Sequence, residues 1–241
     1  MGTSLDWLKG HVDNIVFDEA LFRVNYGENK YIFGALYTVE EDEVDIFAIS
    51  SIYDTIIDLN TKIKYSFNAV VKCNPSENLM EHKMFEKPSE NEMKALYYIE
   101  NMIFRTSTLW DMLAQLCNVF WKINRPIDKI YTGAFFHDYS QGKNKKSFAK
   151  DVYNYFSEED EIKSDTERWK GNFEYIKKYR NKMTHKNSPN ITILSNFGMQ
   201  LRPPAIFILK RVTEDYLKAI EFIMRILDDI FIELKKGTLD D

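Results

Sequence analysis

The chain has 241 residues and a formal net charge of −5, with 44% hydrophobic, 29% charged and 15% aromatic residues. A chain of this length and composition can bury a hydrophobic core, which excludes disordered and fibrous proteins. It contains only 9 glycines and 6 prolines, so long uninterrupted elements are favoured over a turn-rich all-β fold. We expect a single domain over residues 1–241.

Three features bear on the compartment of the protein. The first residues lack a basic region followed by an apolar core, so we expect no secretory signal. No run of about eighteen apolar residues is present, so we expect no contact with a membrane. The two cysteines, Cys73 and Cys117, lie far apart without a CxxC spacing, which excludes a disulfide scaffold and a cysteine zinc finger. The sequence therefore predicts a cytoplasmic protein.

Charge is unevenly distributed along the chain. The acidic balance weighs against a general nucleic-acid binder, which usually carries a basic face. Residues 142–150 and 177–186 are nevertheless locally basic, whereas residues 157–161 are acidic. Most such runs are solvated faces. The second basic segment is of interest because of the motif that it contains.

The predicted elements begin with an N-terminal elaboration, residues 1–40, in which residues 11–38 form either a hairpin or an irregular cover. Helix starts are indicated further on by S/T-x-x-E capping boxes and by a proline pair, at residues 38–41, 89–92, 164–167 and 203–204. Apolar residues then recur at intervals of three and four, which predicts helices over residues 41–73, 90–124, 146–156, 165–187 and 205–236.

These helices predict a mainly all-α fold, a bundle of four to five long helices spanning residues 41–241. A bundle is the natural way for such amphipathic helices to bury their apolar stripes. We expect the helix over residues 165–187 to lie between the helix over 90–124 and the final helix.

Common catalytic templates are missing from the sequence. There is no P-loop, no dinucleotide-binding glycine fingerprint, no HExxH zinc helix and no nucleophile elbow. The four histidines are scattered along the chain, at His11, His82, His137 and His185. We therefore expect neither a metal site nor a bound cofactor.

One segment, residues 179–186, combines groups that can act on a phosphodiester. It places Arg180 and His185 five residues apart, with Asn181 directly after the arginine. On an ideal helix the arginine and the histidine are about 140° apart and about 7.5 Å apart along the axis. At i,i+4 spacing, Arg180 lies beside Thr184 and Asn181 lies beside His185.

This Arg-x4-His pattern, with asparagine after the arginine, resembles the signature of the HEPN superfamily of all-α domains. The resemblance covers a HEPN-like core at about residues 90–236: a long helix, an intervening region, the motif helix and a long final helix. It implies a metal-independent endoribonuclease that cleaves RNA by 2′-hydroxyl transesterification, in a toxin or defence system. It also implies a homodimer, with an antitoxin or another regulatory protein as a further partner.

The chemistry of the segment agrees with these roles. His185 can transfer protons near neutral pH, and Arg180 offers a permanently charged fork that matches phosphate oxygens. Asn181 could orient His185 or bind the scissile phosphate. The predicted substrate-binding residues, which attract the RNA backbone or add a donor, are Lys178, Lys182, Thr184 and Lys186.

Two other interpretations remain open. The domain could be a HEPN module that binds RNA or a protein without catalysis. Alternatively, the motif could be accidental in a helical-bundle interaction protein, with His185 merely favoured by the dipole at the end of its helix. In the catalytic interpretation, one copy supplies a single imidazole and a single guanidinium, so we expect a homodimer with the motif at or beside its axis.

Overall fold

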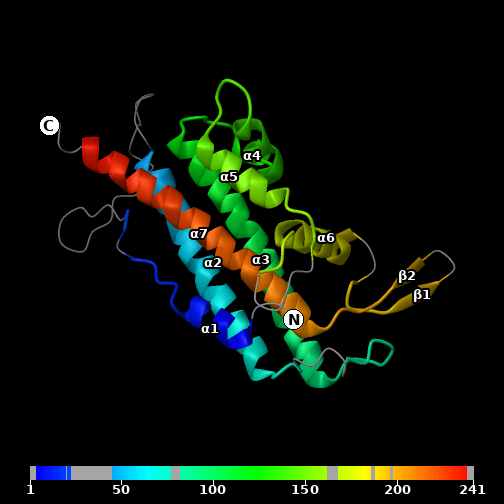
Figure 1. The fold of residues 1–241 in the computed structure, drawn as a ribbon. Helices are drawn as coiled ribbons and strands as arrows, with labels where there is room; N and C mark the ends of the chain where they lie inside the picture. The colour runs from blue at the N-terminus through cyan, green and yellow to red at the C-terminus, as the bar shows by residue number, and fades with distance from the viewer. Residues whose placement is uncertain are drawn as a thin grey trace.

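The structure of the protein is a computed structural model that describes residues 4–19, 21–22, 45–76, 82–161, 168–185, 188–195 and 198–237. Within these ranges it contains seven α-helices, one short 3-10 helix and one two-stranded sheet (Figure 1). The prediction of a mainly all-α fold is confirmed. The capping boxes at 38–41 and 164–167, and most of the segment predicted as a hairpin or cover at 11–38, lie outside the described residues.

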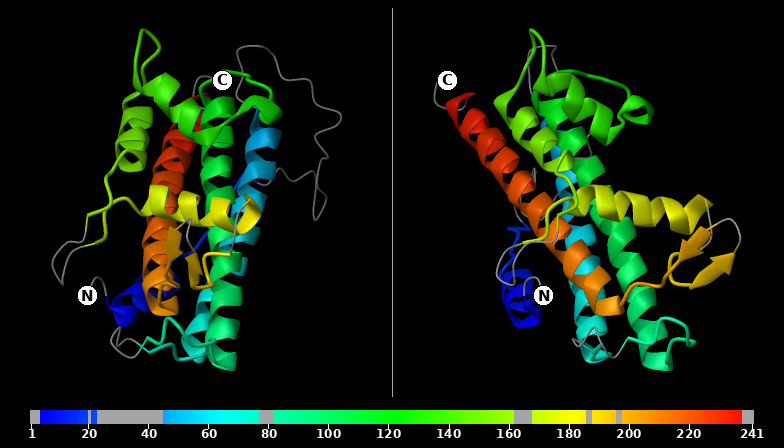
Figure 2. Two further views of the ribbon diagram at one scale, coloured as in Figure 1. Left: turned by 90° about the vertical axis from the view of Figure 1, so that its right-hand side faces the viewer. Right: turned by 45° about the vertical axis from the view of Figure 1, so that its right-hand side comes forward.

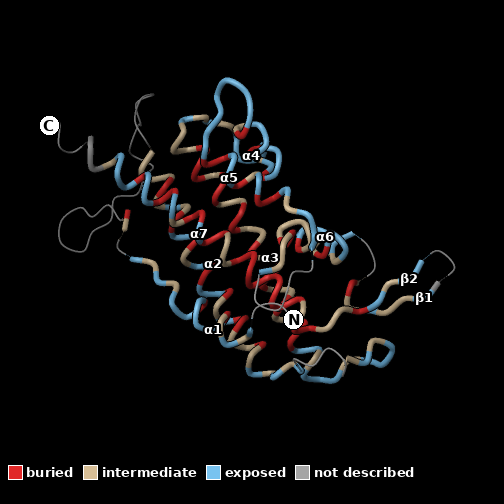
Figure 3. The backbone as a smooth tube through the Cα atoms, viewed as in Figure 1, coloured by how far each residue is buried: buried red, intermediate tan, exposed pale blue. Residues whose placement is uncertain are grey.

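Three long helices form the centre of the molecule: α2 (Ile46–Lys72), α3 (Glu90–Phe120) and α7 (Ala205–Gly237). Helix α3 packs against both α2 and α7, so that the three lie side by side (Figures 1 and 2). The short helix α1 (Leu5–Asp13) packs against α7 through the buried side chains of Leu8 and Val12. Figure 3 shows that the buried residues follow the facing sides of these helices, as their apolar spacing predicts.

Two of the three long helices begin where the sequence predicts, whereas α2 begins at Ile46 and not at residue 41, because Asp45 is its N-cap. The hydroxyl of Ser89 accepts a hydrogen bond from the backbone N–H of Glu92 at 3.2 Å, as the capping box predicts. Helix α7 starts directly after the proline pair. Helix α3 ends at Phe120 rather than at residue 124, because the chain reverses through the positive φ angles of Lys122 and Asn124.

The region after α3, which the sequence left without a defined role, contains a second helical layer. It comprises the 3-10 helix η3 (Ile127–Lys129), α4 (Thr132–Ser140) and α5 (Ser147–Phe156), of which only α5 was predicted. Helices α4 and α5 pack against each other, and α4 also packs against α3 (Figure 2). Trp121 stacks on Phe135 of α4 with ring centroids 6.0 Å apart, which ties this layer to the end of α3.

The motif helix α6 (Asn172–His185) is shorter than predicted and is placed differently. It begins after Gly171, whose φ of 68° breaks the helix, so the described part of the bundle has three long helices rather than four or five. Helices α3 and α7 pack directly on each other, and α6 runs across both from outside instead of lying between them (Figure 2).

A short β-hairpin lies between α6 and α7 in the chain. The strands β1 (Ile193–Ser195) and β2 (Gly198–Gln200) form an antiparallel hairpin, in which Ile193 pairs with Gln200. This hairpin was not predicted, because strands of three residues are too short to give a repeating pattern. Across the described ranges, none of the helices has both the length and the apolar character needed to cross a membrane.

Candidate functional site

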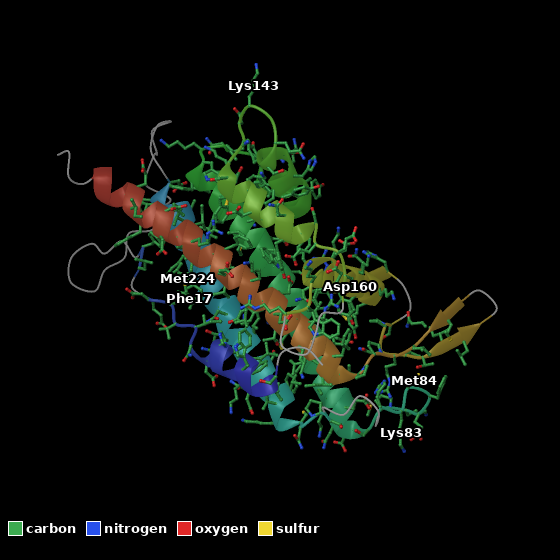
Figure 4. All side chains as sticks on the ribbon, in the orientation of Figure 1. Phe17, Lys83, Met84, Lys143, Asp160 and Met224 are labelled. Atoms are coloured by element: carbon green, nitrogen blue, oxygen red, sulfur yellow. The ribbon has the colours of Figure 1, made fainter. Side chains whose placement is uncertain are left out.

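The first turn of α6 is fixed to α7 by buried charges. The side chain of Arg211 is 1% exposed, and its Nη1 donates a hydrogen bond to Oδ1 of Asp160 at 2.7 Å. Its guanidinium also lies 4.3 Å from the centre of the Tyr175 ring on α6. Glu214 accepts a hydrogen bond from the side-chain amide of Asn172, the first residue of α6, at 2.9 Å. These contacts set the direction in which α6 leaves the bundle (Asp160 is labelled in Figure 4).

The middle of α6 is fixed to α3, and the chain after α6 is fixed to the hairpin. The hydroxyl of Tyr179 donates a hydrogen bond to the side-chain oxygen of Asn190, and the amide of Asn190 donates in turn to Glu100 of α3. Burial raises the pKa of Glu100 above its ordinary value, and the hydrogen bond from Asn190 opposes this shift. Gln200 of β2 donates to the backbone carbonyl of Ser188 at 2.8 Å. Helix α6 is therefore held at its first turn and at Tyr179 in its middle, and the motif begins directly after this second contact.

The predicted site residues differ in exposure. Asn181, Lys182, Thr184 and His185 are exposed, whereas Arg180 is half-buried. The hydroxyl of Thr184 donates to the backbone carbonyl of Arg180 at 3.2 Å, so it is engaged with its own helix.

The lysines of the motif helix differ in how far their charge is compensated by neighbouring carboxylates. Lys178 forms an ion pair with Glu174 on the same helix at 3.7 Å, so its charge is partly compensated. Lys177 also pairs with Glu174, at 3.2 Å. Lys186 lies outside the described residues. The described lysine with the most freedom to attract an anion at the motif is therefore Lys182.

Four of the predicted site residues line one pocket of about 810 Å³ at the last two turns of α6. One wall of the pocket is α6 itself, and the opposite wall consists of Gln200, Leu201 and Pro203 between β2 and α7. The predicted residues in its lining are Lys178, Asn181, Lys182 and His185. The pocket thus combines an imidazole, an amide and two ammonium groups.

Arg180 lies elsewhere, in a pocket of about 510 Å³ between α6, α3 and the start of α4. Its lining includes the aromatic residues Tyr131 and Phe173 and the carboxyl groups of Asp111 and Asp215. No described residue forms a hydrogen bond or an ion pair with the guanidinium of Arg180, so this cation is free to bind a ligand. The structure therefore brings the predicted residues into two pockets rather than one.

Asp215, a buried carboxyl on α7 that was not predicted as a site residue, lines the pocket of Arg180. Burial raises its pKa to about 7, although the hydroxyl of Tyr155 donates to it at 2.7 Å and Nε1 of Trp110 donates at 3.2 Å. A signal for Asp215 was present in the sequence, because it is a charged residue beside the apolar core positions of the helix predicted over residues 205–236.

No group of three or more His, Cys, Asp or Glu side chains in the described ranges is arranged to hold a metal ion.

The comparisons with known proteins do not assign the chain to a family. No family model, no curated protein and no solved structure matches the chain. The HEPN superfamily therefore enters only through the resemblance of the Arg180–His185 motif.

Proposed function

We propose that the protein is a HEPN-type, metal-independent endoribonuclease that acts in the cytoplasm. The observation that carries this proposal is the set of motif side chains around α6. His185 opens into a basic pocket, and Arg180 has no anionic partner among the described residues. Transesterification by the 2′-hydroxyl requires proton transfer and charge compensation at phosphorus, which an imidazole and an unpaired guanidinium can supply.

In this reaction the 2′-oxygen attacks the adjacent phosphorus and the bond from phosphorus to the 5′-oxygen breaks. His185 takes the proton from the 2′-hydroxyl while water protonates the leaving 5′-oxygen, or it protonates the 5′-oxygen while water takes the 2′ proton. Arg180 compensates the charge of the pentacoordinate phosphorus through paired N–H donors. The products are a 2′,3′-cyclic phosphate and a 5′-hydroxyl.

The remaining motif residues bind and orient. Asn181 and His185 line the same pocket, so the amide can position the imidazole or donate to a phosphate oxygen. Lys182, Lys178 and Lys186 attract the RNA backbone without reading its sequence. Thr184 supports the helix end, since its hydroxyl is bonded to the backbone.

The distribution of the motif over two pockets supports a homodimer as the active form. Two copies that pair their motif helices can place Arg180 of one protomer beside His185 of the other. Apolar side chains of the chain segment that borders the pocket of His185 support such an association: Ile191, Leu194 and Met199 are 56%, 62% and 71% exposed. An RNase of this kind fits a toxin or defence role, under the control of an antitoxin or another regulatory protein.

A second candidate function is RNA or protein binding without catalysis. It is favoured by the same separation of Arg180 from His185, because a binding module does not need the two groups in one cleft. The exposed position of His185 at the end of α6 is also what an accidental motif predicts, and the cleavage test below separates these functions.

The test is cleavage of a fluorogenic RNA in the presence of EDTA. Wild-type protein should cleave it, and Arg180→Ala and His185→Ala should each lower the rate by about a hundredfold or more. His137→Ala, which removes an exposed imidazole on α4, is the matched control and should retain full activity. Full activity of both motif variants would remove the proposed site, and loss of cleavage in EDTA would indicate another mechanism.

A further inference from the structure

A second basic surface lies around the loop between α4 and α5, where the sequence is locally basic at residues 142–150. The surface is hollowed, with a volume of about 560 Å³, and we call it the lysine hollow. It is lined by Trp121, Lys122, Ile123, Tyr139, Lys143, Asn144, Lys145 and Lys146, and no carboxylate is among these residues. Figure 4 shows Lys143 at the tip of the loop, with its side chain pointing away from the body of the molecule.

Three of the four lysines that line the lysine hollow have no acidic partner among the described residues. No described residue forms an ion pair with Lys143, Lys145 or Lys146. Helices α4 and α5 contain one carboxylate each, Asp138 and Asp151, and both are already paired. Their partners are arginines, at 3.3 Å for Asp138 and 2.8 Å for Asp151. In a protein with a net charge of −5, this is a local concentration of free cations.

The side chains that line the lysine hollow suit a flexible polyanion. Its floor contains the half-buried rings of Trp121 and Tyr139, and the ammonium of Lys146 lies 5.9 Å from the centre of the Trp121 ring. Lys146 is also the N-cap residue of α5, whose first turn has no side-chain cap and no acidic residue. Clustered lysines that face solvent around such a hollow are typical of surfaces that bind single-stranded nucleic acid along its phosphate backbone.

Helix α4 connects this surface to the candidate site. Tyr131 and Thr132 at its start line the pocket of Arg180, and Tyr139 near its end lines the lysine hollow. Nine residues of helix span about 13 Å, which corresponds to about four nucleotides at the stacked spacing of about 3.4 Å per nucleotide. One strand can therefore reach both places.

We propose that the lysine hollow binds the phosphate backbone of the RNA substrate several nucleotides away from the cleaved bond. The choice of RNA as the ligand rests on the proposed function, whereas the uncompensated charge and the hollow do not depend on it. The surface provides affinity for longer RNAs without sequence preference, and the motif of α6 performs the chemistry.

The experiment compares two triple variants of the full chain in the His185→Ala background, so that bound RNA stays intact. One carries Lys143→Ala, Lys145→Ala and Lys146→Ala. The control carries Lys9→Ala, Lys72→Ala and Lys87→Ala, which removes the same charge from exposed positions on other elements. Binding of a fluorescent RNA of about 20 nucleotides is measured by anisotropy across a range of salt concentrations.

Removing three phosphate contacts should lower the slope of log affinity against log salt by about 2, since each contact with a single strand contributes about 0.7. The control should keep the wild-type slope, and an RNA of about three nucleotides should bind equally to both variants. Equal slopes in the two variants would overturn the inference, as would selective loss of binding to phosphatidylserine vesicles with RNA binding unchanged.

The two proposals fail in different ways. Cleavage that depends on Arg180 and His185, together with an unchanged salt slope in the lysine variant, would remove only the role of the lysine hollow. RNA binding that depends on these lysines, in a protein that cleaves no RNA, would remove only the catalytic proposal.

Discussion

Arg180 and His185 lie on the same helix, yet they line two different pockets. The arginine opens toward α3 and α4, and the histidine opens toward the segment between β2 and α7. Their separation by about 140° on an ideal helix accounts for this arrangement. Because both groups lie on one helix, a rotation of α6 as a rigid body cannot bring them together within a single chain.

Subunit complementation is the first prediction that follows from this separation. When Arg180→Ala and His185→Ala proteins are mixed under conditions of subunit exchange, cleavage activity should reappear. About a quarter of the wild-type rate is expected, because half of the dimers are mixed and each mixed dimer has one complete Arg–His pair. Native mass spectrometry can verify the exchange. Exchange without any recovery of activity would mean that each chain needs its own pair.

The oligomeric state provides a second, independent prediction. Sedimentation should show a homodimer at micromolar concentration, and the specific activity should fall on dilution through the dissociation constant. A monomer that keeps full ribonuclease activity at every concentration would contradict the role assigned to the partner protomer.

The parts of the fold that the sequence predicted are those with a long periodic signal. The stripes of α2, α3 and α7 extend over many turns, and the Ser89 cap fixes one start, so these helices could be located within a few residues. Helix α4 and the hairpin were missed because each is held by tertiary contacts rather than by local pattern. The stacking of Phe135 on Trp121 is one such contact, and no local rule reveals it.

The candidate site was predictable in composition but not in arrangement. The motif predicted Arg180 and His185 near a helix end, and both lie in the last turns of α6. The pockets could not be predicted, because their walls come from η3, α4 and the hairpin, which are distant in sequence. Asp215 illustrates the same limit, since its hydrogen-bond partners lie on α3 and α5.

Asp215 predicts a specific pH dependence of stability. Its pKa is about 7 in the folded protein against an ordinary value of 3.8, because burial disfavours the charged form. Between these values the folded state keeps a proton that the unfolded state loses. The free energy of unfolding should therefore fall as the pH rises toward 7, by up to about 1.4 kcal/mol per pH unit, and then level off.

The measurement is urea denaturation at several pH values for wild-type protein and for Asp215→Asn, which cannot ionise. The difference in unfolding free energy between the two should change with pH below about 7 and be constant above it. Asp58→Asn, at an exposed position, is the control and should follow the wild-type profile. A constant difference between wild type and Asp215→Asn over this whole range would contradict the raised pKa.

Gly171 and Gly142 form a matched pair for testing how the start of α6 is packed. Both have positive φ, 68° and 77°, so alanine should cost about 1 kcal/mol at either position from the backbone conformation alone. A Cβ at Gly171 would also lie 2.8 Å from the backbone nitrogen of Asp160, whereas at Gly142 it would meet nothing within 4 Å. Gly171→Ala should therefore be more destabilising by about 1 kcal/mol or more. Equal melting temperatures of the two variants would show that the contact with Asp160 is easily relieved.

The last prediction concerns a buried hydrogen bond between α2 and α7. The hydroxyl of Tyr216 donates to the side-chain oxygen of Asn60 at 2.5 Å, and both side chains are buried. Tyr216→Phe should lower the free energy of unfolding by about 1–3 kcal/mol, because it leaves a buried acceptor without a donor. Tyr65→Phe, at an exposed position on α2, removes the same hydroxyl and should change stability by less than about 0.5 kcal/mol. Adding Asn60→Leu to Tyr216→Phe should recover part of the loss, since an apolar pair needs no hydrogen bond. A double variant less stable than Tyr216→Phe alone would indicate that the cost arises from packing rather than from the unsatisfied amide oxygen.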